Sequence, residues 1–333
     1  MATHYVALAD VLVVVDHGSD GATATESLSS HRLQSVAASP ARPDRVFVGT
    51  FESGLLRSVD GGETFGRVGR GTIAADAVTS VAVSPHDPAV VWAGTEPSAV
   101  YRSGDGGDTW ERRPGLTDLP SATRWSFPPR PTTHHVRWIE PDPTAAGRLY
   151  VAVEAGALIR TDDGGRTWQD HPAGARRDSH SLATHPRVPG LVYAAAGDGF
   201  AVSLDGGDTW AYPQDGLAHR YCWSVVADPG DPDRLVLSSA SGPRAAHGSR
   251  TAESYVYRRD GDGPWQRVDA GGLPTGTGVT RPVLATTGET GTVVAATNRG
   301  LFRSRDAGES WSTVVRWPER ARSRACQGLA VVA

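Results

Sequence analysis

One eight-residue pattern recurs along this chain at intervals close to 45 residues, and it limits the possible folds more than any other feature. We call it the box: a Ser or Thr, a central Asp, Gly residues, a second Ser or Thr and a final aromatic residue, as in SVDGGETF at 58–65 and SGDGGDTW at 103–110. A unit of about 45 residues that ends in such a turn has the size of one four-stranded propeller blade. The central aspartates of five good copies and one degenerate copy are Asp60, Asp105, Asp163, Asp205, Asp260 and Asp306.

The rest of each unit predicts four short strands, which we name A to D in chain order. Ser-Val-Ala-x-Ser-Pro at 35–40 and 80–85 predicts strand A, and apolar runs at 46–50 and 91–95 predict strand B. The box then forms the turn between strands C and D, where its glycines permit positive φ and its Asp and hydroxyl side chains hydrogen-bond across the turn. Its final Trp or Phe anchors the turn in the apolar interior. We therefore interpret the box as structural rather than catalytic.

The two ends of the chain predict how the ring of blades closes. Residues 4–28 have the pattern of strands B, C and D with a box-like turn at 16–21, whereas 327–332 resemble a lone strand A. Together these strands complete one more blade and remove the open edge of the ring. We expect a single all-β domain over 1–333, a seven-bladed β-propeller of four-stranded antiparallel blades closed by pairing of the N- and C-terminal strands. A six-bladed ring is the alternative.

Composition narrows the classes of function. The formal net charge of −4 provides no general attraction to nucleic acid or to anionic membranes, and we expect neither as a partner. The two cysteines, Cys222 and Cys326, form neither a disulfide framework nor a zinc motif, so we expect no metal and no cofactor. The start of the chain lacks a basic segment followed by a long apolar run, so we expect no signal peptide and a cytoplasmic location.

The repeated pattern resembles that of BNR/Asp-box propellers, which include sialidases, sortilin-type receptor ectodomains and photosystem II assembly-factor-like proteins. The resemblance covers nearly the whole chain and implies the propeller fold. It implies no single function, because these proteins include hydrolases, receptors and assembly factors. Sialidases carry an N-terminal Phe/Tyr-Arg-Ile-Pro motif that supplies a carboxylate-binding arginine, and the N-terminal region of this chain has none. The only similar segment, FPPRP at 127–131, lies mid-chain in a proline-rich loop.

Unequal spacing between the boxes predicts where a functional site lies. In an up-and-down blade the A–B and C–D turns share one face, and the B–C and D–A connections share the other. The 58-residue interval implies a long D–A connection at about 114–133, and the 55-residue interval implies a long B–C connection at about 241–254. Both insertions belong to the face opposite the boxes. Since long loops on a rigid scaffold commonly carry function, we expect the site there.

Polar residues that enter strand A or follow strand B give this face its chemistry. Arginine pairs well with carboxylate or phosphate, and aromatic rings stack on sugars. From these positions, which also include His134 and Asp178, we select as ligand-binding candidates His135, Arg137, Glu154, His180, Tyr221, Arg281 and Arg299. Pairing of these charges with each other, a structural Tyr221 and a three-histidine metal site are the competing interpretations.

The favoured function is binding of a small anionic or carbohydrate-like ligand, or of a protein partner, at the mouth of the central channel. The alternative is a glycoside hydrolase or lyase that acts at the same mouth. A hydrolase needs two convergent carboxylates, for which Glu52, Glu96, Glu154 and Glu253 are candidates. A lyase needs a base such as His135 or His180. The sequence leaves open whether the chain is an enzyme.

Overall fold

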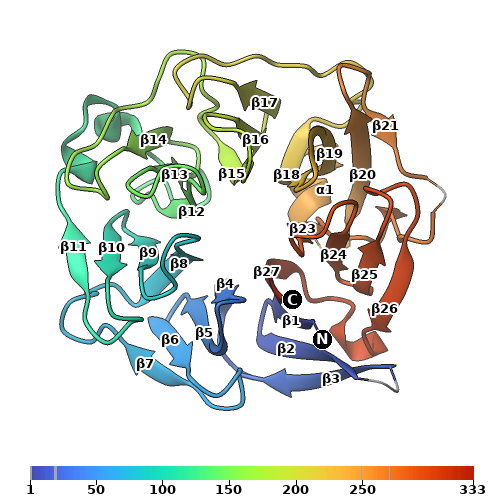
Figure 1. Ribbon diagram of the computed structural model, residues 1–333, viewed down its shortest axis with the longest axis horizontal. Helices are drawn as coiled ribbons and strands as arrows, with labels where there is room; N and C mark the ends of the chain where they lie inside the picture. The colour runs from blue at the N-terminus through green and yellow to red at the C-terminus, as the bar shows by residue number, and fades with distance from the viewer. Residues whose placement is uncertain (1, 19–20, 249, 270) are drawn as a thin grey trace.

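A computed structural model describes residues 2–18, 21–248, 250–269 and 271–333. These residues form seven antiparallel sheets arranged as blades around a central axis (Figure 1). The blades follow one another in chain order, and the two termini lie together in one blade, as the colours in Figure 1 show. The predicted seven-bladed propeller is therefore confirmed, and the six-bladed alternative is wrong. Ser19 and Asp20 of the box-like turn expected at 16–21 lie outside the described residues.

Blades 1 to 3 each contain four strands, which follow one another from the channel outward. Blade 1 consists of β27 (Cys326–Val332), β1 (Thr3–Leu8), β2 (Val11–Gly18) and β3 (Gly21–Ser27). Blade 2 consists of β4 (Leu33–Ser39), β5 (Arg42–Thr50), β6 (Leu55–Ser58) and β7 (Gly66–Val68). Blade 3 consists of β8 (Ala77–Val83), β9 (Val91–Glu96), β10 (Val100–Ser103) and β11 (Glu111–Arg113).

The remaining blades vary more at their outer edges. Blade 4 has β12 (Val136–Pro141), β13 (Leu149–Val153) and β14 (Ala157–Thr161), and blade 5 has β15 (Ser179–Thr184), β16 (Val192–Ala196) and β17 (Gly199–Ser203). Blade 6 has β18 (Tyr221–Asp228), β19 (Asp231–Ala240), β20 (Glu253–Asp260), β21 (Gln266–Arg267) and β22 (Gly276–Thr277). Blade 7 has β23 (Val283–Thr286), β24 (Val293–Thr297), β25 (Gly300–Ser304) and β26 (Ser312–Arg316).

Strand D of blades 4 and 5 departs from the expected four-stranded pattern. In each blade it is reduced to a single bridge, between Arg160 and Gln169 and between Val202 and Ala211. Pro172 and Pro213 follow these bridges closely, and proline cannot donate a backbone hydrogen bond to a sheet. The outermost strand therefore ends after one pair in these two blades.

The ring closes as the termini predicted. Strand β27 pairs antiparallel with β1, from Thr3 opposite Val332 to Leu8 opposite Cys326. Blade 1 then packs against blade 7, where Val6 and Val13 share an apolar cluster with Val294. Central strands such as β2 are apolar at consecutive positions because neighbouring blades cover both faces of each sheet. The core is thus a series of layers between blades.

The five good boxes form nearly identical hydrogen-bonded turns. In the fourth box, Ser203 Oγ donates to Asp205 Oδ1 at 2.8 Å and accepts from the Gly207 amide at 2.8 Å. The Thr209 amide donates to the same carboxylate at 2.9 Å, and hydrogen bonds from Thr209 and Ser203 lower the pKa of Asp205 to about 2. Gly206 and Gly207 have φ values of 75° and 95°, a backbone conformation that favours glycine.

Backbone hydrogen bonds place the boxes and the A–B turns on one face. In blade 2 the amide of Gly61 donates to the carbonyl of Asp44, and in blade 3 the amide of Gly106 donates to that of Ala89. Equivalent bonds join the C–D and A–B turns in blades 4 to 7. The B–C and D–A connections consequently lie on the opposite face.

Candidate functional site

Two long connections close over one cavity on the face opposite the boxes. The connection before β12 contains short 3-10 helices at Leu116–Asp118 and Pro120–Arg124, and the connection between β19 and β20 contains helix α1 (Pro243–His247). These are the two insertions that the box spacing predicted. Their residues and the adjacent blade ends enclose about 710 Å³, lined by Phe127, Pro128, Pro129, Glu154, Ala155, Asp178, Tyr221, Pro243, Arg244, His247, Gly248 and Thr251.

Glu154, in the B–C turn that follows β13, is the carboxylate most firmly held at this cavity. His135 Nε2 donates to its Oε2 at 2.9 Å, and Arg137 Nε lies 3.6 Å from the same oxygen. Burial by itself would raise the pKa of Glu154, but the His135 hydrogen bond and the charges of His135 and Arg137 outweigh burial and lower this pKa. Glu154 is therefore an anion at neutral pH and is poorly suited to donate a proton.

A second carboxylate, Glu96, supports this arrangement from the B–C turn of blade 3. Arg130 forms a two-pronged ion pair with it, at 2.8 and 2.6 Å, and Arg130 comes from the long D–A insertion. Glu96 Oε2 also lies 3.7 Å from His135 Nδ1, and the Phe127 ring packs edge-on against His135 at 4.7 Å. The insertion is thus fastened to the blade ends beside Glu154.

Two buried guanidinium groups stack on Trp223, whose ring packs against His247 of the cavity wall. The guanidinium carbon of Arg137 lies 4.5 Å from the Trp223 ring centre, and that of Arg281 lies 4.1 Å away. Burial lowers the pKa of both arginines, to about 10 for Arg281, which therefore keeps its charge at neutral pH. Neither Nε has a hydrogen-bond partner among the described residues. The Arg137 Nε instead faces the Glu154 carboxylate at 3.6 Å, as an ion pair longer than a hydrogen bond.

His180 and Asp178 complete the polar wall. His180, in β15, is fully buried, and its ring packs against Tyr221 and Trp223 at 4.8 and 4.6 Å. Its Nδ1 donates to the Cys222 carbonyl at 2.6 Å, while Nε2 lies 3.7 Å from Asp178 Oδ2. The other Asp178 oxygen accepts a hydrogen bond from the Ala155 amide at 2.8 Å, so two blades hold this carboxylate.

Tyr221 lines the cavity and bonds to the second insertion. Its hydroxyl lies 2.9 Å from Nε2 of His247 on α1. Burial lowers the pKa of His247 to about 3, so a neutral ring accepts the Tyr221 proton. Burial also raises the pKa of Tyr221, which makes this hydroxyl a hydrogen-bonding group rather than a nucleophile at neutral pH.

The structure brings six of the seven candidate residues together and places the seventh elsewhere. Glu154 and Tyr221 line the cavity; His135, Arg137, His180 and Arg281 lie directly around them. Arg299 lies in the B–C turn of blade 7, where its guanidinium donates to the Gly278 carbonyl at 2.9 Å.

Other polar residues that the sequence pointed to lie outside the cavity wall. Glu52 pairs with Arg32, and Glu253 accepts a hydrogen bond from Tyr255. His134 precedes β12 and packs edge-on against Trp125 at 5.4 Å. Among the described residues no cluster joins His134, His135 and His180, as a three-histidine metal site would require.

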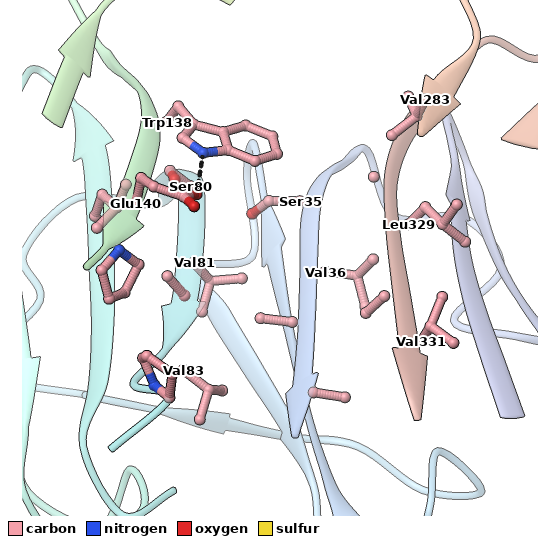
Figure 2. A pocket seen from close by; sticks show the side chains of 18 of the residues that line it. Ser35, Val36, Ser80, Val81, Val83, Trp138, Glu140, Val283, Leu329 and Val331 are labelled. Carbon is pink, nitrogen blue, oxygen red and sulfur yellow. Dashed lines mark hydrogen bonds between the residues drawn. The ribbon is translucent and has the colours of Figure 1, made fainter. Parts of the chain in front are cut away.

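The central channel lies next to this site and is mostly apolar. It encloses about 480 Å³ and is lined by inner strands, which contribute Val36, Val81, Leu329 and Val331 among other residues (Figure 2). Figure 2 also shows Trp138 Nε1 donating to Glu140, at 2.9 Å. Arg137 lines the channel and lies against Glu154, so it marks the boundary between channel and cavity.

Sequence reasoning missed Trp223, His247 and Arg244 and left Asp178 out of the final set. Trp223 follows Tyr221 by two residues on β18. Because successive side chains of a strand point to opposite faces of the sheet, this spacing could have placed both rings on the same side. His247 and Arg244 lie in an insertion that the box spacing had located. The position of α1 over the channel mouth depends on tertiary packing, which the sequence pattern does not describe.

The closed ring of blades defines this protein as a seven-bladed β-propeller, structurally similar to GH74 enzymes and to YCF48. The GH74 xyloglucanase from Xanthomonas campestris superposes with a TM-score of 0.64 and 19% identity, over 92% of this chain and 53% of its own. An ancestral GH74 enzyme superposes with a TM-score of 0.64 and 17% identity, over 90% of this chain and 38% of its own. YCF48 bound to D1 peptide superposes with a TM-score of 0.56 and 19% identity, over 85% of this chain and 82% of its own. This chain spans about half or less of the GH74 chains.

At these identities the likeness shows the fold alone. No family model matches the sequence, and comparison with curated proteins finds no match either. No helix in the described part of the chain is both long and apolar enough to cross a membrane.

Proposed function

We propose that this propeller binds a small sugar acid in the mouth cavity. The observation that carries the proposal is that the two insertions, from separate parts of the ring, line a single cavity that adjoins the buried arginines Arg137 and Arg281. Loops that cover one cavity on a rigid scaffold are typical of ligand sites.

The cavity wall matches both halves of such a ligand. Phe127, Tyr221 and three prolines offer flat apolar surfaces for the face of a sugar ring, while Glu154 and Asp178 accept hydrogen bonds from its hydroxyls. Arg137 and Arg244 supply donors for a carboxylate, and an arginine fork fits a carboxylate with two parallel hydrogen bonds.

Calorimetric titration of the whole chain with glucuronate, galacturonate and the matching neutral sugars tests the proposal. We expect saturable binding of an acid and weaker binding of its neutral counterpart. Arg137→Ala is expected to weaken acid binding about 10- to 100-fold, the value of a charged hydrogen bond. Arg137→Lys, which keeps the charge without the fork, is expected to weaken it less.

Arg102→Ala is the matched control, because Arg102 also stacks on a tryptophan, Trp92, at 5.7 Å, but lies outside the cavity. Its affinity should equal that of the unmodified chain. Equal affinities for acid and neutral sugar, or equal losses in Arg102→Ala and Arg137→Ala, would contradict the proposal. Binding of a peptide but of no sugar would instead support the protein-partner function, for which the peptide-bound YCF48 structure is a precedent.

A second candidate function is glycoside hydrolysis, favoured by two carboxylates, Glu154 and Asp178, with oxygens within 4.8 Å of each other. The lowered pKa of Glu154 suits a nucleophile or base rather than the acid that this reaction also requires. Release of reducing ends from oligosaccharides, abolished in Glu154→Gln, would support it. Binding without turnover would leave the sugar-acid site as the function.

A further inference from the structure

The imidazole of His180 presents an unused lone pair toward Asp178, a residue of the cavity wall. The hydrogen bond from Nδ1 to the Cys222 carbonyl places the proton of the neutral ring on Nδ1. Nε2 is therefore the unprotonated nitrogen, and it is buried without a hydrogen-bond partner among the described residues. A buried acceptor of this kind is costly unless something positive or a donor meets it.

Two carboxylates face this nitrogen. Asp178 Oδ2 lies 3.7 Å from Nε2, and one ligand atom each of Glu154, Asp178 and His180 lie within 4.8 Å of one another. A lone pair and two anionic oxygens repel one another, so the arrangement calls for a positive charge between them.

We propose that Glu154, Asp178 and His180 bind one divalent transition-metal ion of the zinc type. One imidazole and two carboxylates form a ligand set that suits zinc or manganese better than magnesium or calcium, which prefer oxygen ligands alone. Two ligands each about 2.1 Å from a tetrahedral ion lie roughly 3.4 Å apart, close to the His180–Asp178 separation. The proposal departs from the expectation of no metal drawn from the sequence.

The groups around the three ligands hold them as metal ligands are usually held. The Cys222 carbonyl orients His180, the Ala155 amide binds the Asp178 oxygen that faces away, and His135 binds Glu154. The positive charge of Arg137 repels a cation at this point. Its Nε lies 3.6 Å from the Glu154 carboxylate, so the arginine and the ion would both interact with that group. Since two of the ligands line the cavity, an open coordination position would face it, and any contact to a sugar oxygen there rests on the proposed function.

Titration of tag-free, metal-stripped protein with zinc alone tests the site. We expect one ion per chain by calorimetry and elemental analysis. When Co²⁺ replaces zinc, we expect visible absorption bands of the intensity that tetrahedral or five-coordinate Co²⁺ gives. Asp178→Asn keeps an oxygen to accept the Ala155 amide, so it should fold, and it is expected to bind zinc at least about tenfold more weakly. His180→Gln is the second variant.

His185→Gln is the matched control, because His185 is as buried as His180 but both its nitrogens have partners, the Asp228 carbonyl and the Arg187 amide. It should bind zinc like the unmodified chain. The absence of saturable 1:1 binding, or equal affinity in Asp178→Asn and the control, would overturn the proposal. Because no sugar is present, either result leaves the sugar-acid titration to be judged separately.

Discussion

At the scale of single residues, two glutamates close to the channel show how surroundings decide charge. Burial raises the pKa of Glu140 to about 7, and hydrogen bonds from Trp138 and Thr184 only partly offset it. Glu154 is buried as well, but His135 and Arg137 reverse the direction and lower its pKa. The difference is the presence of cationic partners, because neutral donors stabilise a carboxylate less than charged ones.

Glu140 makes a prediction about pH and stability. Its pKa in the fold, about 7, lies above its ordinary value of 4.5, so on raising the pH the unfolded chain loses this proton first. Glu140 therefore destabilises the fold progressively as pH rises from about 4.5 through 7. Between pH 4.5 and 8 we expect the unfolding free energy of Glu140→Gln to gain about 3 kcal/mol relative to that of the unmodified chain, measured by urea unfolding. Parallel stability curves for the two proteins would contradict this.

At the scale of elements, the box turns on one face stabilise the fold, and the insertions on the other face form the cavity. A box turn ends in an aromatic anchor, and Trp110 is 8% exposed, with its Nε1 donating to the Gly107 carbonyl at 3.1 Å. The insertions make few strand pairs and instead cover the cavity with loops and α1. Changes in a box are thus expected to alter stability, and changes in an insertion to alter ligand binding.

Trp110→Ala tests this division. Removing a large buried aromatic side chain is expected to cost about 3–5 kcal/mol of unfolding free energy, measured with urea at neutral pH. Trp168→Ala should cost less, since that ring is only half-buried. The folded fraction of both variants should keep its affinity for any cavity ligand. Loss of affinity without loss of stability in Trp110→Ala would show that the box face takes part in binding.

At the scale of the whole molecule, stability depends on closing the ring. Strand β27 occupies the innermost position of blade 1, so the last strand of the chain holds the first three in place. Residues of β27 also pack against blade 7 through Cys326, which is fully buried. Closure therefore protects both the edge of β1 and the contact between blades 1 and 7.

Removal of 326–333 is expected to open the ring. The truncated chain exposes the edge of β1 and should unfold more than about 10 °C below the full chain and with a broader transition, by calorimetry. Removal of Ala333 alone, an exposed residue beyond β27, is the control and should leave the transition unchanged. A peptide of residues 324–333 added in trans should restore part of the loss. An unchanged transition in the longer truncation would show that β27 is dispensable.

Most of the fold was predictable because its information is local and repeated. Each box carries its own turn chemistry, and the spacing of boxes such as Asp60 and Asp105 reports the length of a blade directly. The same spacing located both insertions and the face they share. The lost fourth strand of blades 4 and 5 was not visible this way, because it depends on where prolines fall relative to the strand edge.

The sequence by itself determined the architecture, the closing blade and the polar residues at each strand end. Only the tertiary structure decided which of those residues meet: it joined His135 to Glu154, set Asp178 opposite His180, stacked two arginines on Trp223 and left Arg299 in another turn. The physical reason is that a repeat gives equivalent residues equivalent positions, whereas contacts across the mouth depend on how non-repeated loops pack. The site therefore lies where the repeat is interrupted.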